Sequence, residues 1–104
     1  MSYTIESIVE NCKGKNIFQM IDYLNKNISF CNNALLNMKR MGNISEYQIK
    51  ENREYSEALL LYLTNSIIPS GFSIQKFKVF KPLISQLVDD GMSSYFLGIF
   101  DNHQ

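Results

Sequence analysis

Residues 45–63 have the sequence SEYQIKENREYSEALLLYL, and this stretch decides the fold. Ser45 followed three residues later by Gln48 has the pattern of a capping box, in which polar side chains satisfy the first free amides of a helix. No glycine or proline follows until Pro69. The pattern therefore predicts one long helix over about residues 46–67.

The two halves of this helix differ in polarity. Residues 46–57 are amphipathic, whereas residues 58–63 are apolar on every side. A helical segment that is apolar all round is stable only when other elements surround it, so we predict that this helix is the central one of the domain. In its first half, two pairs of opposite charge have the spacing of helical ion pairs: Glu46 with Lys50, and Arg53 with Glu57.

The amino-terminal part of the chain carries apolar residues at helical spacing. Thr4 can cap a first helix that Gly14 ends, and Asn16 with Gln19 forms a second capping box. Residues 25–29 contain two asparagines and a serine, whose side chains compete for backbone hydrogen bonds. We therefore expect a break or kink there, followed by a third helix.

The part of the chain after the long helix begins with a turn at residues 69–71. Residues 72–80 fit either a helix capped by Ser73 or a strand, and the helix is favoured because the two apolar alternations are out of register. Pro82 lacks an amide hydrogen, so it should kink this helix or start a new one after a short break. A last short helix is expected within residues 93–100.

These patterns predict an all-α fold: a single domain, residues 1–104, of five to six helices packed around the central helix. A composition of 45% hydrophobic and 19% charged residues is typical of a globular chain. Ten basic and ten acidic residues cancel. This balance disfavours a dedicated binder of nucleic acid or of an anionic membrane surface.

The expected compartment is the cytoplasm. Glu6 and Glu10 stand where a secretory leader would carry positive charge, and no apolar run is long enough to span a bilayer. Cys12 and Cys31 lie within apolar helical patterns, so we predict that both are reduced core residues.

Groups that perform catalysis or bind metals are scarce in the sequence. His103 is the only histidine, and no second histidine or cysteine stands at ligand spacing from it. Glycine-rich phosphate loops and the common nucleophile and zinc motifs do not occur. We therefore expect a protein that is not an enzyme and has no catalytic residues, no metal and no cofactor.

One candidate binding surface lies on the amphipathic half of the long helix. Tyr47, Glu51, Glu54 and Tyr55 are spaced by three, four and seven residues and so share one stripe. Tyrosine offers a large contact area with a polar end, and carboxylates complement a basic protein partner. The alternative is that Tyr55 and Tyr47 pack at the edge of the core while the glutamates are solvated. A second acidic region comprises Asp89, Asp90 and Asp101.

A second candidate surface is the basic and aromatic segment 76–81. Lys76, Lys78 and Lys81 could contact phosphates while bases stack on Phe77 and Phe80. In a helix, however, the two phenylalanines share the core face and the lysines only solvate the opposite side.

The function expected from these features is a non-enzymatic protein–protein interaction. The class that fits best is a small bacterial immunity or antitoxin-like inhibitor, which occludes a toxin or another protein partner with a basic surface. The alternatives are a nucleic-acid-associated regulator that uses the lysine segment, and a homodimeric helical scaffold.

Overall fold

The computed structural model describes residues 3–38 and 45–92, and these residues form helices and connecting turns without a strand. The predicted all-α class is therefore confirmed. The elements are α1 (Ile5–Cys12), α2 (Ile17–Leu36), α3 (Glu46–Asn65), α4 (Ile74–Phe77), the 3-10 turn η2 (Lys78–Phe80) and α5 (Lys81–Asp89).

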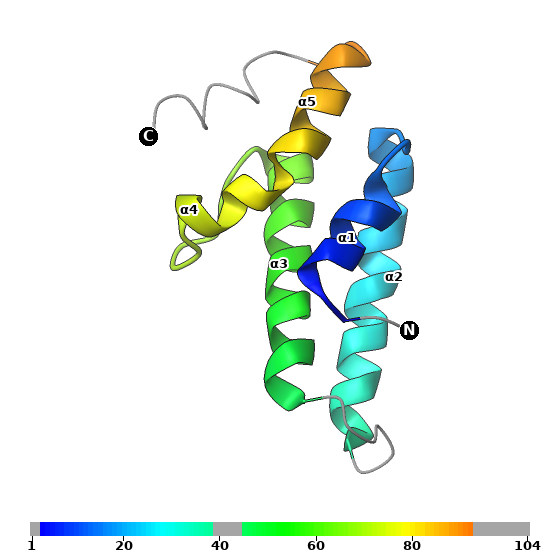
Figure 1. Ribbon diagram of the computed structural model, residues 1–104, viewed down its shortest axis with the longest axis vertical. Coiled ribbons are helices and arrows are strands. Elements are labelled where there is room, and N and C mark those ends of the chain that lie inside the picture. The colour runs from blue at the N-terminus through cyan, green and yellow to red at the C-terminus, as the bar shows by residue number, and fades with distance from the viewer. Residues whose placement is uncertain (1–2, 39–44, 93–104) are drawn as a thin grey trace.

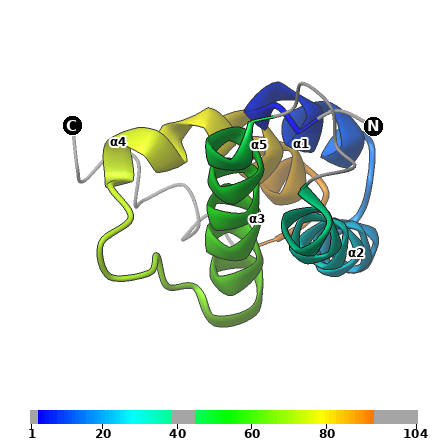
Figure 2. The same ribbon diagram turned by 90° about the horizontal axis from the view of Figure 1, so that it is seen from below.

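The two longest helices, α2 and α3, lie side by side and antiparallel (Figure 1). The short helix α1 packs against both of them. Seen from below, α3 lies between α2 on one side and α4 on the other, with α1 and α5 at the top of the picture (Figure 2). The long helix predicted from residues 45–63 is thus the central element of the described chain.

The helix starts follow the predicted capping residues. Thr4 accepts a hydrogen bond from the amide of Ser7 at 3.2 Å, and Ser45 accepts one from the amide of Gln48 at 3.1 Å. At the start of α2 the capping box is reciprocal, because Asn16 accepts from the Gln19 amide at 2.9 Å and the Gln19 side chain accepts from the Asn16 amide at 3.0 Å. Three of the short polar residues in the sequence therefore set where helices begin.

The predicted break at residues 25–29 is wrong, because α2 is continuous from Ile17 to Leu36. The side chains of Asn25 and Ser29 are exposed to solvent, where they do not disturb the helix. Asn27 is buried and uses its amide in hydrogen bonds to another helix. The second and third predicted helices are therefore one helix, α2. The described residues contain four helices of eight residues or more, whereas five to six helices were predicted.

The segment after α3 is helical, as favoured over the strand. A single α-helical turn, α4, continues through η2 into α5, and Pro82 is the second residue of α5. Proline suits this position since the first turn of a helix does not use its amide hydrogens. Pro82 thus starts a new helix instead of kinking an old one. The helix predicted within residues 93–100 lies outside the described residues.

The main hydrophobic core lies where α3 meets the other helices. Its buried members come from every helical element, and on α3 they are Ala58, Leu59, Tyr62 and Leu63. Leu60 and Leu61 of the same apolar run keep part of their surface exposed. Other helices therefore cover most, but not all, sides of α3 over residues 58–63.

A network of buried polar side chains connects α2, α3 and the start of α1. The Asn27 amide donates to the Asn52 side-chain oxygen at 2.7 Å and to the Ser56 hydroxyl at 2.8 Å. The Cys31 thiol donates to the same Asn52 oxygen at 3.4 Å, and the Asn52 amide donates to the Thr4 carbonyl at 3.0 Å. Among the described residues, no buried side-chain nitrogen or oxygen lacks a partner. Asn52 and Ser56 are therefore buried polar residues in the first half of α3, which the sequence pattern did not predict.

A second polar contact connects α5 with the turn between α1 and α2. The Gln86 side chain accepts a hydrogen bond from the Gly14 amide at 3.0 Å and donates one to the Lys15 carbonyl at 2.9 Å. Gly14 has a φ of 78°, a conformation that favours glycine. One side chain thus satisfies two backbone groups of the turn.

Replacing Asn52 by alanine should lower the free energy of unfolding by about 2–3 kcal/mol, because the variant loses several buried hydrogen bonds and leaves their partners unsatisfied. Urea denaturation measures this change. The control is Asn25→Ala on α2, an exposed site where the change should stay within about 0.5 kcal/mol. Equal stability of the two variants would contradict a structural contribution of the network.

Candidate functional site

The outer side of α3, away from α2, carries the predicted stripe of tyrosine and glutamate. Tyr47 is 74% exposed, and its hydroxyl donates a hydrogen bond to Glu51 Oε2 at 3.0 Å. This hydrogen bond raises the pKa of Tyr47, since the phenol donates to the carboxylate only while it is protonated. Glu54 lies one turn further along and is exposed. We call Tyr47, Glu51 and Glu54 the acidic face.

The negative charge of the acidic face is not compensated by the basic residues of its own helix. Lys50 pairs with Glu46 at 3.2 Å. Arg53 is directed toward α2, where its Nη1 donates to Asn32 at 3.0 Å, and its Nε lies 3.9 Å from Glu57. The ion pairs of the described residues include neither carboxylate of the acidic face. Within the described part of the chain, the acidic face thus has two negative charges without an ion pair.

Tyr55, the fourth residue predicted for this surface, has a different environment. Its ring makes edge-to-face contacts with Phe72, at a centroid distance of 5.0 Å, and with Phe80, at 6.0 Å. Burial and the carboxylate of Glu51 raise the pKa of its hydroxyl. Tyr55 thus packs at the edge of the core, whereas Tyr47 does not. Tyr47, Glu51 and Glu54 therefore lie together on the surface, whereas Tyr55 packs against Phe72 in the loop that follows α3.

A surface hollow of about 250 Å³ lies beside the acidic face. It is lined by two residues of α3 and by the loop that follows this helix: Glu54, Glu57, Pro69, Ser70, Gly71 and Phe72. The sequence predicted the turn at residues 69–71 but not that this loop would lie beside the middle of the same helix. We call this hollow, with its six lining residues, the acidic pocket.

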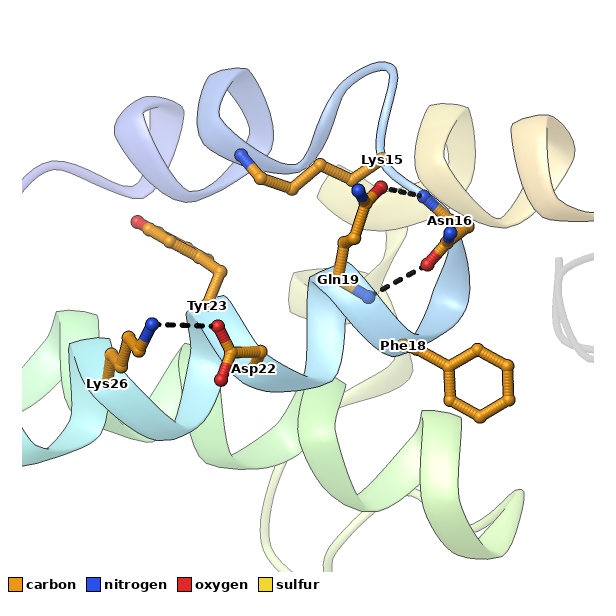
Figure 3. Close-up of a pocket in the computed structure, with 7 residues that line it drawn as sticks. All are labelled: Lys15, Asn16, Phe18, Gln19, Asp22, Tyr23 and Lys26. Carbon is orange, nitrogen blue, oxygen red and sulfur yellow. Dashed lines mark hydrogen bonds and ion pairs between the residues drawn. The ribbon is translucent and has the colours of Figure 1, made fainter.

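A larger hollow of about 540 Å³ is lined by the end of the turn before α2 and by the first turns of α2 (Figure 3). Its charged groups already have neighbours, since Lys26 pairs with Asp22 at 2.9 Å and Lys15 lies 5.5 Å from the centre of the Tyr23 ring. Phe18, 78% exposed, points away from the other lining residues (Figure 3). Its lining contains two lysines and one aspartate, so the hollow has an excess of one positive charge, that of Lys15, which lies beside the Tyr23 ring.

The basic segment 76–81 lacks the aromatic surfaces that base stacking needs. Phe77 and Phe80 are fully buried and contact each other at a centroid distance of 5.4 Å. Lys76 and Lys81 are exposed, Lys78 is partly exposed, and the ammonium of Lys76 lies 6.0 Å from the centre of the Phe72 ring. The lysines of this segment are therefore accessible from solvent, whereas the rings of Phe77 and Phe80 are not.

Both cysteines are free and buried, as predicted. Burial raises the pKa of Cys12 to about 11, although the charge of Lys15 lowers it in part. Burial also raises the pKa of Cys31, whose thiol donates to Asn52. A raised pKa disfavours the ionised form that a nucleophile requires. His103 lies outside the described residues.

Three further findings bear on function. Within residues 3–38 and 45–92, no three His, Cys, Asp or Glu side chains gather as metal ligands would. Over the same residues, no helix has the length and apolar character needed to cross a membrane. No protein family, curated protein or solved structure matches this chain.

The thiols of the native protein should react slowly with a disulfide reagent at about pH 8. A pKa of about 11 leaves Cys12 with a thiolate fraction on the order of a hundredfold below that of an ordinary thiol. The reaction should accelerate as the pH rises toward this value, and both thiols should react at once in urea. Fast labelling of the native chain would show that the thiols are accessible and not core residues.

Proposed function

We propose that this protein is a non-enzymatic interaction module that binds a protein partner through the acidic face of α3. The observation that supports this best is the pair of carboxylates, Glu51 and Glu54, that make no ion pair within residues 3–38 and 45–92 and lie beside the exposed ring of Tyr47. A flat surface of this kind suits contact with a basic protein surface, since it combines an aromatic side chain with charges of one sign.

Among proteins of this kind, the class we propose is a small immunity or antitoxin-like inhibitor of bacterial origin. Such a protein acts by covering a partner's functional surface, so it needs a rigid scaffold and one complementary face. The buried network around Asn52 supplies rigidity directly behind the acidic face. Nucleic-acid binding through Lys76, Lys78 and Lys81 is less well supported, because Phe77 and Phe80 are buried.

The test is a charge reversal of the acidic face, Glu51→Lys with Glu54→Lys. Wild-type protein and variant are used to capture partners from a lysate of the source cells, and the partner retained by the wild type is then titrated by calorimetry. The variant should bind it about tenfold more weakly or worse, because like charges now oppose each other across the interface. Its melting temperature should change little since both side chains are on the surface.

The matched control is Asp89→Lys with Asp90→Lys at the end of α5, which makes the same change in net charge on a different surface. This control should bind the partner like the wild type. Loss of binding in the control but not in the α3 variant would refute the proposal. A melting temperature that rises with protein concentration, in the absence of any partner, would favour the homodimeric scaffold instead.

A further inference from the structure

The acidic pocket has the size of a site for one side chain. Pockets that hold small molecules or cofactors occupy about 300–1,000 Å³, and this one has about 250 Å³. It opens on the surface beside Glu54, which belongs both to the pocket and to the acidic face. A side chain of a protein bound to the acidic face can therefore enter the pocket.

The chemistry of the lining residues selects a planar cation. Glu54 and Glu57 are three residues apart on α3 and so lie on the same side of the helix. Glu54 has no ion pair among the described residues, and the single pair of Glu57, with Arg53, is long at 3.9 Å. An arginine guanidinium donates in a fork that carboxylates accept, and its flat surface stacks on aromatic rings. Phe72 supplies such a ring in the pocket.

The ring of Phe72 is held in place before any partner binds. It makes edge-to-face contacts with Tyr55 at a centroid distance of 5.0 Å and with Phe77 at 6.5 Å. Phe77 is fully buried, so these contacts connect the loop to the core. The ammonium of Lys76 already lies 6.0 Å from the centre of the Phe72 ring, so an incoming guanidinium must share this ring with it or displace it. A prearranged pocket loses little conformational entropy on binding.

We propose that the acidic pocket binds an arginine side chain of the partner protein, with the guanidinium between Glu54 and Glu57 and against Phe72. This inference rests on the proposed function and adds the identity of one anchoring residue. Arginine is enriched among the interface residues whose removal weakens binding most, which fits a single pocket beside a flat face.

The probe is the capped tripeptide acetyl-Gly-Arg-Gly-amide, titrated into the full isotope-labelled chain at constant salt and followed by backbone amide chemical shifts. The amides of Glu54, Glu57, Gly71 and Phe72 should shift together and reach saturation. The same peptide with citrulline, which is nearly isosteric but uncharged, should shift them far less. Shifts of equal size with citrulline, or arginine shifts confined to other parts of the chain, would overturn the assignment.

Variants test the carboxylates directly. Glu54→Gln with Glu57→Gln should weaken arginine-peptide binding about tenfold, because both charged acceptors are lost. Glu46→Gln on the same helix is the control and should bind like the wild type, since Glu46 does not line the pocket. Both variants change exposed side chains, and their melting temperatures check that the fold is intact. Unchanged affinity of the double variant would refute the proposal.

A comparison with the full partner separates this inference from the proposed function. Glu57→Gln alters the pocket and leaves Tyr47, Glu51 and Glu54 unchanged. If Glu57→Gln leaves the affinity for the partner unchanged but reversal of Glu51 and Glu54 abolishes binding, the acidic face binds the partner and the pocket does not. If both changes weaken binding, both proposals are supported. If the partner tolerates both changes, the proposed function fails, and the tripeptide titration still decides whether the pocket recognises arginine.

Discussion

The arrangement of the helices depends on the buried hydrogen bonds of the Asn52 side chain. It accepts hydrogen bonds from Asn27 and Cys31 of α2 and donates one to the Thr4 carbonyl at the start of α1. Hydrophobic contacts are tolerant of small sliding movements, whereas buried hydrogen bonds are satisfied in only one register. A shift of α3 by one residue along α2 would leave several buried polar groups without partners. The network therefore selects one alignment of the two long helices.

This alignment also determines what α3 presents to solvent. Because Asn52 and Ser56 face α2, residues on the opposite side of α3 are left outside, and these include Tyr47 and Glu54. Tyr55 lies between the two sides and contacts Phe72, which places the loop of residues 69–72 next to Glu54 and Glu57. The acidic face and the acidic pocket are thus consequences of how the interior of the same helix is packed.

Local sequence patterns predicted what local physics controls. Thr4, Asn16 and Ser45 cap helices by hydrogen bonds to residues three positions away, so their effect is visible in a short window of sequence. Asn27 could not be interpreted in this way. A mid-helix asparagine is compatible with a helix when its amide is solvated, as at Asn25, or when a distant residue takes it up, and the partner of Asn27, Asn52, is 25 residues away.

The same distinction applies to the candidate site. The stripe of Tyr47, Glu51 and Glu54 follows from helical spacing alone, so the sequence was sufficient to find it. The pocket depends on a loop that returns to α3 through contacts between aromatic rings, and no spacing rule connects Phe72 with Glu57. Tyr55 shares the helical stripe by sequence, yet its ring packs against Phe72 and Phe80. Only tertiary packing distinguishes a supporting tyrosine from an exposed one.

The charge distribution indicates how such a face would achieve selectivity. The whole chain has a formal net charge of zero, so it exerts little long-range attraction on a basic partner. At physiological salt, charges interact over about 8 Å, which is comparable to the distance between neighbouring turns of α3. Glu51 and Glu54 therefore act on groups that already touch the face. In the complex that we propose, recognition would depend on the fit at contact, for which the Phe72 ring and the Tyr47 side chain are already positioned by contacts within the chain.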